Sequence, residues 1–335
     1  MIDIKNKKIL LFAPRFFGYD SVIKEKLIGL GAHVDLYNER PSTNVFIKAI
    51  IRLYKKLLFV YIDNYFKQIV KKNRYKDFDY VIVIKGEVFN TKIVENLKHS
   101  YPSAKFILYL WDSIQNYKDI RQCLHLFDNS LTFDLKDATE IPLLKFRPLF
   151  FIDDYLKCNS IDNKLIDYKY DLLFVGTVHS DRWLFLKSIK DQADKSNLNI
   201  YYYLYVQSPL VFLFRKLFDK RFVSIPLKDI KFRSISKEEI IQLTTCSRAV
   251  LDIQHPKQTG LTMRTIEVFG AKRKLITTNT IIKDYDLFSQ CNISVVDRSA
   301  PVISSSFIMS EYTSMPNELY HKYSLDGWLE SLFSQ

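Results

Sequence analysis

A phosphate-binding arrangement is predicted within residues 249–278. The apolar run 249–253 predicts a buried strand, and the polar, proline-containing stretch after it predicts a loop. Gly260 and Thr262 then open a predicted helix, which Gly270 ends before a second strand begins. The start of such a helix offers free N–H groups and the positive end of the helix dipole, so it is a place where an anion can bind.

Two charged residues near the start of this predicted helix extend the chemistry. Arg264 lies in the first turn, where its planar guanidinium could hold a diphosphate. Glu267 follows three residues later on a similar face, and its carboxylate could accept both hydroxyls of a ribose. Together they describe a site for a nucleoside diphosphate. The alternative is an ordinary helix with a surface Arg–Glu pair, because short motifs also match by chance.

The spacing of Gly260, Arg264, Glu267 and Gly270, followed by the sequence LITTN at 275–279, resembles the C-terminal domain of GT-B glycosyltransferases. The CgeB-like and the capsule or lipopolysaccharide biosynthesis transferases are the types it resembles. The resemblance covers 171–285 most firmly. It implies an α/β fold with two Rossmann-like, doubly wound domains facing a cleft, and a nucleotide-sugar donor on the C-terminal domain.

A second segment of the C-terminal half fits the same resemblance. Phe174, Val175 and Gly176, followed by Arg182, match the segment whose loop lies under the donor diphosphate in the resembling transferases. We therefore expect Gly176 and Arg182 on the donor side. His179 lies in the same loop and is a catalytic candidate, because histidine is the usual acid or base at neutral pH; a plain loop residue is the alternative.

Two further details of these loops follow from the sequence. Ser180 or Asp181 is placed to cap the helix that comes next. Many retaining GT-B enzymes carry an acidic residue eight positions before the ribose-binding Glu, whereas Thr259 occupies that position here. The resemblance therefore leaves open whether the reaction retains or inverts the configuration of the sugar.

The N-terminal half alternates apolar runs with helical patterns, as doubly wound domains do. The runs expected as buried parallel strands are 8–13, 33–37, 78–85 and 105–110. Ligands of such sheets gather beyond the carboxyl ends of the strands. The residues expected there, on the acceptor side, are Phe17, Gly18, Lys85 and Gly86. The missing GxGxxG pattern argues against a nicotinamide or flavin site in this half.

Asp112 is the carboxylate that we select as a candidate general base. It follows the strand 105–110 within the sequence Trp111-Asp112-Ser113. In the resembling transferases this strand end belongs to the N-terminal domain and faces the cleft. The alternative role for Asp112 is to cap the following helix.

Composition limits the classes of protein to consider. A chain of 335 residues accommodates two domains, which we expect at 1–152 and 168–316, with a C-terminal helix at 317–335 crossing back to the first domain as the resemblance implies. The four cysteines are far apart and form no CxxC pair, which argues against a zinc site and for a reducing compartment. No convincing DxD motif is present, so no metal site is expected. The N-terminus is not typical of a signal peptide, so a cytoplasmic location is expected.

Two basic, aromatic segments could contact a membrane. Residues 45–74 predict one long amphipathic helix, and 209–222 are again basic and apolar. The net charge of +12 also favours anionic partners. The alternative is that these helices pack on the core and keep a solvated basic side. A peripheral position at the inner face of the cell membrane is therefore a hypothesis.

The function expected from the resemblance is metal-independent glycosyl transfer in surface polysaccharide biosynthesis: capsule, exopolysaccharide or lipopolysaccharide. A hexosyltransferase or related enzyme would move a sugar from a nucleotide-diphosphate donor to a glycan or lipid-linked acceptor, with no other cofactor. The alternative is a non-catalytic nucleotide-sugar-binding or scaffold protein of the same pathway. A nucleic-acid partner is not expected, because the basic residues are dispersed and no recognition motif is present.

Overall fold

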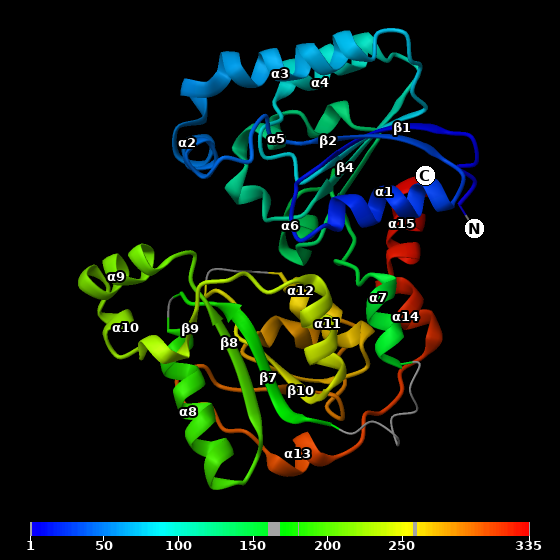
Figure 1. The fold of residues 1–335 in the computed structure, drawn as a ribbon. Helices are drawn as coiled ribbons and strands as arrows, with labels where there is room; N and C mark the ends of the chain where they lie inside the picture. Colours follow the sequence, from blue (N-terminus) through cyan, green and yellow to red (C-terminus); the bar gives the residue numbers. More distant parts are fainter. Residues whose placement is uncertain (1, 160–167, 180, 257–259, 335) are drawn as a thin grey trace. The chain divides into compact units, whose positions relative to one another are not determined.

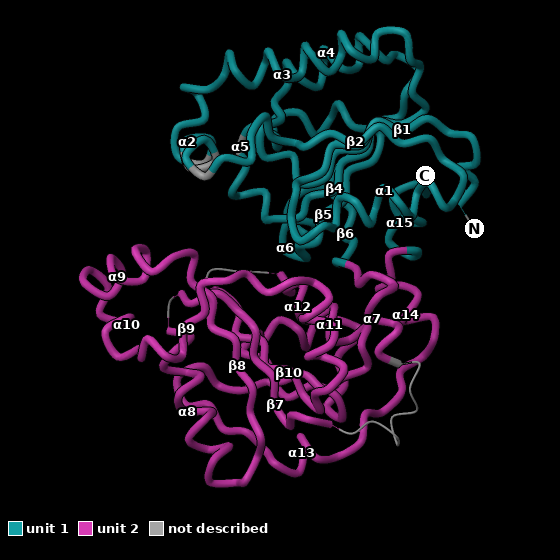
Figure 2. The backbone as a smooth tube through the Cα atoms, viewed as in Figure 1, with its two compact units in different colours: residues 1–149, 326–335 teal, residues 150–325 magenta. Residues whose placement is uncertain are grey.

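The computed structural model describes residues 2–159, 168–179, 181–256 and 260–334. The chain forms two compact units (Figure 2). Unit 1 comprises Met1–Leu149 and Asp326–Gln335, and unit 2 comprises Phe150–Leu325. The functional domains expected at 1–152, 168–316 and 317–335 stay a prediction.

Unit 1 contains a parallel sheet in the order β2-β1-β3-β4-β5-β6. Its strands are β1 (Lys8–Ala13), β2 (His33–Asn38), β3 (Tyr80–Ile84), β4 (Lys105–Leu110), β5 (Asn129–Thr132) and β6 (Lys145–Phe146). The apolar runs selected from the sequence form the central strands, because a strand covered by helices on both faces must be apolar on both faces.

Helices cover both faces of this sheet. They are α1 (Tyr19–Gly29), α4 (Thr91–Ser100), α5 (Lys118–Gln122), α6 (Leu135–Glu140) and the last helix, α15 (Leu325–Phe333). Figure 1 shows α4 on one face and α1 with α15 on the other. Trp328 of α15 is fully buried, and its ring centroid lies 5.0 Å from that of Tyr109 in β4.

The prediction of one long helix over 45–74 is wrong. The segment forms α2 (Val45–Tyr54), a 3-10 turn η1 (Lys55–Leu58) and α3 (Phe59–Lys72). The helix is interrupted at Tyr54, where φ is −139° and ψ is 46°. Directly after the break, the Lys55 ammonium donates to the Glu87 carbonyl at 2.7 Å and pairs with Asp119 at 2.7 Å. These distant contacts outweigh the helical preference of the local sequence.

Unit 2 contains a second parallel sheet, in the order β12-β11-β10-β7-β8-β9. Its strands are β7 (Tyr170–Thr177), β8 (Ile200–Tyr205), β9 (Ile230–Lys231), β10 (Ser247–Asp252), β11 (Lys274–Thr277) and β12 (Ile293–Val295). The two apolar runs on either side of the predicted phosphate-binding helix start are strands β10 and β11, which are neighbours in the sheet.

The helices of unit 2 include the segment predicted to be opened by Gly260 and Thr262. They are α7 (Asp153–Leu156), α8 (Arg182–Lys195), α9 (Pro209–Phe218), α10 (Lys220–Val223), α11 (Lys237–Thr245), α12 (Met263–Gly270), α13 (Ser305–Met309) and α14 (Asn317–Tyr323). Figure 1 shows α11 and α12 on one side of the strands and α8 on the other. Each unit is thus a doubly wound α/β layer structure, which confirms the predicted fold class.

Candidate functional site

The start of α12 is tied to the end of strand β10. Thr262 caps the helix: its hydroxyl oxygen accepts the N–H of Thr265 at 3.1 Å. The hydroxyls of Thr262 and Thr265 both donate to one carboxylate oxygen of Asp252, at 2.7 and 2.8 Å. Asp252, the last residue of β10, is only 5% exposed. Sequence reasoning missed Asp252, although an acidic residue that ends a buried strand just before the predicted site was a usable signal.

Arg264 and Glu267 lie together in the first turns of α12. An Arg264 Nη1 to Glu267 Oε2 distance of 3.0 Å makes them an ion pair. They form the i, i+3 pair considered from the sequence, but not a surface pair, since their side chains are 17% and 11% exposed. The hydroxyl of Tyr155 in α7 forms a hydrogen bond with the Glu267 carboxylate. Burial and this carboxylate raise the pKa of Tyr155. Glu267 is therefore held in place from two sides.

Arg182 fixes the loop beyond β7. Its Nε donates to the Ile253 carbonyl at 2.7 Å and its Nη1 to the Thr177 carbonyl at 3.0 Å. Gly176 permits this approach, because a Cβ there would lie 2.9 Å from the Phe174 ring and 3.2 Å from Nη1 of Arg182. Burial lowers the pKa of Arg182 to about 10, so it still carries its charge at neutral pH.

Arg298, which the sequence reasoning missed, joins three loops beyond the strands of unit 2. Its Nε and Nη2 donate to the two carboxylate oxygens of Asp181 at 2.8 and 2.5 Å. Its Nη1 donates to the Gln254 carbonyl at 3.0 Å. Asp181 precedes α8, but its side chain makes no capping hydrogen bond, because its carboxylate is turned to Arg298. Ser180, the other predicted cap, lies outside the described residues.

His179 lies in a positively charged environment in the same loop region. Its ring centroid is 5.1 Å from that of His255. Burial, followed by the charges of Arg182 and of nearby groups that include His255 and Arg298, lowers the pKa of His179 to about 4. The imidazole is therefore neutral at neutral pH, where it cannot act as a cationic acid. The same field that keeps it neutral favours a bound anion.

These groups share one edge of the unit 2 sheet. Strands β12, β11, β10 and β7 are neighbours in that order, and the loops with Arg298, His255, His179 and the start of α12 follow their carboxyl ends. Gly260 leads into α12, and its carbonyl accepts the Asn279 side-chain amide at 3.2 Å. Thr259, which stands where many retaining GT-B enzymes have an acidic residue, lies outside the described residues. The described part of this edge combines three arginines with a helix start, the chemistry expected for a diphosphate.

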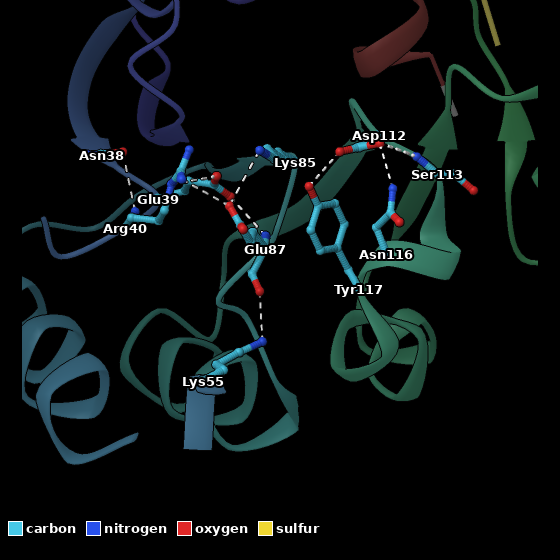
Figure 3. A network of polar contacts seen from close by, with 10 residues as sticks. All are labelled: Asn38, Glu39, Arg40, Lys55, Lys85, Glu87, Asp112, Ser113, Asn116 and Tyr117. Carbon is cyan, nitrogen blue, oxygen red and sulfur yellow. Dashed lines mark hydrogen bonds and ion pairs between the residues drawn. The ribbon is translucent and has the colours of Figure 1, made fainter. Parts of the chain in front are cut away.

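In unit 1, Asp112 lies just beyond the carboxyl end of β4 (Figure 3). Its carboxylate accepts the Ser113 N–H at 3.0 Å, the Asn116 amide at 3.0 Å and the Tyr117 hydroxyl at 2.7 Å. The Ser113 bond fixes the turn before the short 3-10 helix η2 (Ile114–Asn116). Two of these donors share Oδ1 and the third uses Oδ2, so the three bonds hold the carboxylate in position and occupy three of its roughly four lone pairs.

Lys85 and Gly86 follow β3 with an unusual backbone. Both have left-handed dihedral angles, with φ of 79° and 72°. Glycine is needed at the second position, because a Cβ there would also lie 3.1 Å from Ile120. The turn directs the Lys85 ammonium to Glu87, 3.4 Å away, and over the ring of Tyr117 at 5.7 Å (Figure 3).

Two buried carboxylates, Glu39 and Glu87, lie beside this turn, and the sequence reasoning missed Glu39. Glu39, fully buried after β2, accepts the N–H of Glu87 at 2.9 Å. Arg40 pairs with Glu39 at 3.6 Å and with Glu87 at 3.3 Å (Figure 3). Burial raises the pKa of Glu39 to about 7, although Lys85 and Arg40 oppose the shift. The usable signal was that both acids follow strands whose carboxyl ends meet at the same edge.

Phe17 and Gly18 line a hollow beyond β1. Its volume is about 480 Å³, and its lining consists of Arg15, Phe16, Phe17, Gly18, Asp20, Ser21, Leu36 and Asn38. Phe17 is 57% exposed and packs edge-on against Phe16 at 4.6 Å. Since β2, β1, β3 and β4 are neighbours, the predicted acceptor-side residues and Asp112 all lie at one edge of the unit 1 sheet. Aromatic faces beside polar groups suit a polar ring such as a sugar.

Across the described ranges, no three His, Cys, Asp or Glu side chains gather in a way that could hold a metal ion. The four cysteines are free thiols. Within the part of the chain that the structure describes, no helix has the length and apolar character needed to cross a membrane.

The fold has close structural counterparts among known proteins. Anabaena HepE, solved with UDP and glucose, superposes with a TM-score of 0.59 over 98% of this chain and 100% of that one, at 9% sequence identity. Sucrose-phosphate synthase from Thermosynechococcus elongatus gives a TM-score of 0.53 over 98% of this chain and 95% of that one, also at 9% identity. The chain therefore has the GT-B fold of two Rossmann-like units.

A third counterpart bears on nucleic acid. An alpha-glucosyltransferase solved with UDP and a 13-mer DNA gives a TM-score of 0.50 over 81% of this chain and 79% of that one, at 13% identity. The expectation that nucleic acid is not a partner gains no support from this protein and stays a prediction. No model of a known protein family matches the chain, and no curated protein matches it by sequence.

Proposed function

We propose that this protein is a glycosyltransferase that takes its sugar from a nucleotide-diphosphate donor held at the carboxyl edge of the unit 2 sheet. The observation that carries the proposal is the edge itself, where Arg182, Arg264 and Arg298 stand beside the start of α12 on a GT-B fold. Two of these arginines are held by ion pairs, Arg264 with Glu267 and Arg298 with Asp181. Nucleotide sugars of the UDP type are bound by proteins of similar fold, which supports this class of donor.

The chain's own residues would serve the departure of the diphosphate. As the bond to the sugar breaks, negative charge grows on the leaving phosphate, and preorganised cations and N–H groups stabilise it. Arg264 and the first turn of α12, capped by Thr262, are the groups we assign to that charge, and Gly176, Arg182 and Gly260 shape the loops around it. Glu267 is assigned to the ribose hydroxyls. Since these groups are protein cations, the proposed reaction needs no metal.

The acceptor is assigned to unit 1. Phe17, Gly18, Lys85 and Gly86 surround the carboxyl edge of its sheet, and Asp112 is the group proposed to take the proton of the acceptor hydroxyl if the reaction inverts. His179 remains a candidate for positioning or proton transfer on the donor side.

A glycan or lipid-linked acceptor of surface polysaccharide biosynthesis is the proposed biological context, with a cytoplasmic location at the inner face of the membrane. The basic charge of the chain and the exposed apolar helices support this assignment. The transferred sugar would be a hexose or a relative of one.

A second function, binding of a nucleotide sugar without transfer, is favoured by one observation. The proposed base Asp112 already accepts three hydrogen bonds. A scaffold protein of the same pathway would keep the donor site and lack turnover.

Thermal unfolding in the presence of UDP, GDP, ADP and their sugar conjugates tests the donor site. A ligand that binds only the folded chain raises the melting temperature, and at one hundred times its Kd it adds about 2.7 kcal/mol of stability. One nucleotide should stabilise the wild type, and Arg264→Ala should lose most of that response. Arg233→Ala is the matched control, because Arg233 also pairs with a glutamate in unit 2 but its side chain is 69% exposed, in the loop between β9 and α11.

The transfer step is tested with the nucleotide sugar so identified and a membrane extract as acceptor. The transferase is supported if the wild type releases the nucleoside diphosphate and Asp112→Asn does not, although this variant still binds the nucleotide. Binding without release in any extract supports the non-catalytic alternative. A folded wild type that responds to none of the nucleotides contradicts both.

A further inference from the structure

Helix α9 exposes a continuous apolar stripe. Leu210, Leu213, Phe214, Leu217 and Phe218 are between 56% and 78% exposed. They occupy positions i, i+3, i+4, i+7 and i+8 of the helix, so they share one side of it. We call these five side chains the α9 face. Isolated exposed apolar residues are normal, but a stripe of five on one helix marks a surface that another phase or partner covers.

The α9 face is mounted firmly on unit 2. Phe212 points the other way and is buried, with its ring centroid 6.4 Å from that of Phe222 in α10. Arg215 donates to the Val178 carbonyl at 3.0 Å, and Lys216 donates to the Ile225 carbonyl at 3.2 Å. The helix therefore keeps its apolar stripe outward because its inner side is already engaged.

Basic side chains surround this stripe. Residues 208–231 contain six Lys or Arg and two Asp, a difference of +4. Lys220, Arg221 and Lys228 are exposed, and so are the apolar Val223 and Leu227 between them, at 57% and 61%. Exposed apolar and exposed cationic side chains thus follow one another along the chain through α9, α10 and the turn after α10.

This composition fits lipid better than protein. Protein interfaces are depleted of lysine, whereas helices that lie in a membrane surface combine an apolar face with Lys and Arg that meet anionic headgroups. Each such cation near the surface contributes about 1 kcal/mol of attraction to anionic lipid. The charge complementarity therefore selects an anionic bilayer as the occupant.

Unit 1 carries an independent surface of the same kind. Phe46, Leu53, Leu57 and Val60, in α2, η1 and α3, are between 69% and 79% exposed. The core-packed alternative holds for the other side of this segment, where Ile62, Phe66 and Ile69 are buried. Apolar side chains exposed beside lysines thus occur in both units, although each unit has a core of its own.

We propose that the α9 face docks the protein on an anionic membrane surface, with Leu217 and Phe218 among the inserted side chains. The contact rests on α9 and on the basic residues of α10 and the turn after it, and it does not depend on the proposed reaction.

Co-sedimentation with vesicles tests the docking. The full-length wild type should bind phosphatidylcholine vesicles that contain about one-third phosphatidylglycerol at least about tenfold more tightly than pure phosphatidylcholine, and added salt should weaken the binding. The variant Leu217→Ser/Phe218→Ser should lose at least about tenfold in affinity, since it removes two inserted side chains. Both side chains are over 70% exposed, so the melting temperature should stay unchanged.

Matched controls separate the surface from general effects. Val302→Ser/Met309→Ser removes two other exposed apolar side chains of unit 2, at 73% and 50% exposure, and should bind as the wild type does. Lys220→Glu/Lys228→Glu should weaken binding to the anionic vesicles. Lys195→Glu/Lys283→Glu makes the same change of net charge at exposed sites on α8 and η7 (Thr280–Asp284) and should weaken it much less.

Three outcomes would overturn the docking. They are a wild type that ignores both kinds of vesicle, equal binding to neutral and anionic vesicles, and unchanged binding of the Leu217→Ser/Phe218→Ser variant. A wild type that ignores vesicles but sediments as a dimer, which this variant dissolves, would assign the face to a second copy of the chain instead. Nucleotide stabilisation is measured without lipid, so failure of the docking and failure of the donor site are distinguishable.

Discussion

Two arginines at the carboxyl edge of the unit 2 sheet are held by backbone carbonyls and by Asp181. Arg182 donates hydrogen bonds to two backbone carbonyls, and Arg298 donates to Asp181 and to one backbone carbonyl. Both side chains are therefore held in place without a ligand. This preorganisation is what electrostatic stabilisation of a leaving group requires, because side chains that are already fixed need not reorganise as charge develops.

His179 reports the field of this edge. Its pKa of about 4 results from burial and from the neighbouring cations. A bound nucleoside diphosphate would offset those cations, so the pKa of His179 should rise by about one unit or more. NMR titration of the His179 ring, identified by its loss in His179→Gln, measures this. The signal of His33 in unit 1 should not respond to the ligand, and a His179 pKa that stays constant would argue against a diphosphate at this edge.

Glu39 should make the stability of unit 1 depend on pH. Its pKa of about 7 in the folded chain lies above the ordinary value of 4.5, so folding favours its protonated form. Its contribution is therefore full at pH below the ordinary value and is lost as the pH rises through about 7. The free energy of unfolding should fall by about 2–3 kcal/mol over that range.

Urea denaturation of the wild type and Glu39→Gln between about pH 5 and pH 8 checks this contribution. Glu39→Gln keeps an acceptor for the Glu87 N–H and should flatten the dependence. Glu238→Gln, at a glutamate whose side chain is 75% exposed, should leave it as in the wild type. Equal slopes in all three proteins would show that Glu39 is not the titrating group.

The site residues at the donor edge could be predicted only where their spacing along the sequence placed them on one helix. Arg264 and Glu267 follow Gly260 along one helix, so their neighbourhood is local and visible in the sequence. Asp252 and Arg298 act through partners 10 to 117 residues away, and no local pattern encodes those contacts. Glu39 was missed for the same reason, because its partner Glu87 is 48 residues away.

At the scale of elements, the end of α12 depends on a close approach. A Cβ on Gly270 would lie 2.3 Å from the ring of Phe151, which is fully buried and has no room to move. Gly270→Ala should therefore lower the free energy of unfolding by about 2–3 kcal/mol, despite the better helix propensity of alanine.

The matched control is Gly29→Ala at the last residue of α1, where nothing lies within 4 Å of the added carbon. This change should be neutral or stabilise by up to about 1 kcal/mol. Denaturant titration of both variants compares them, and equal stability would contradict the packing described around Phe151.

Most elements could be predicted because both sheets are buried and parallel. Their strands are short apolar runs, and β1 and β4 begin and end where the pattern predicted. The segment 45–74 could not be predicted as broken, because its interruption at Tyr54 accompanies contacts of Lys55 with residues 32 and 64 positions away. Local periodicity carries no information about such contacts.

At the scale of the whole molecule, the chain leaves unit 1 and returns to it. Trp328, Leu329 and Leu332 of the last helix are buried in unit 1, to which residues 326–335 belong. Trp328→Ala should lower the stability of unit 1 by about 3–5 kcal/mol, because it empties a large buried site.

Hydrogen exchange distinguishes which unit is weakened. Trp328→Ala should raise exchange in strands β1, β3 and β4 and leave β7 and β10 protected. Trp183→Ala, which removes a buried tryptophan of unit 2, should do the reverse. Loss of protection in both units from either variant would contradict the division of the core into two.

The most direct test of the donor site is hydrogen–deuterium exchange of the wild type with and without each nucleoside diphosphate. The site described here predicts that one nucleotide slows exchange in 176–182, 252–256 and 260–267 of unit 2, beside Arg182, His255 and Arg264. Protection confined to unit 1, or no protection by any nucleotide, would contradict the assignment of the donor to the carboxyl edge of the unit 2 sheet.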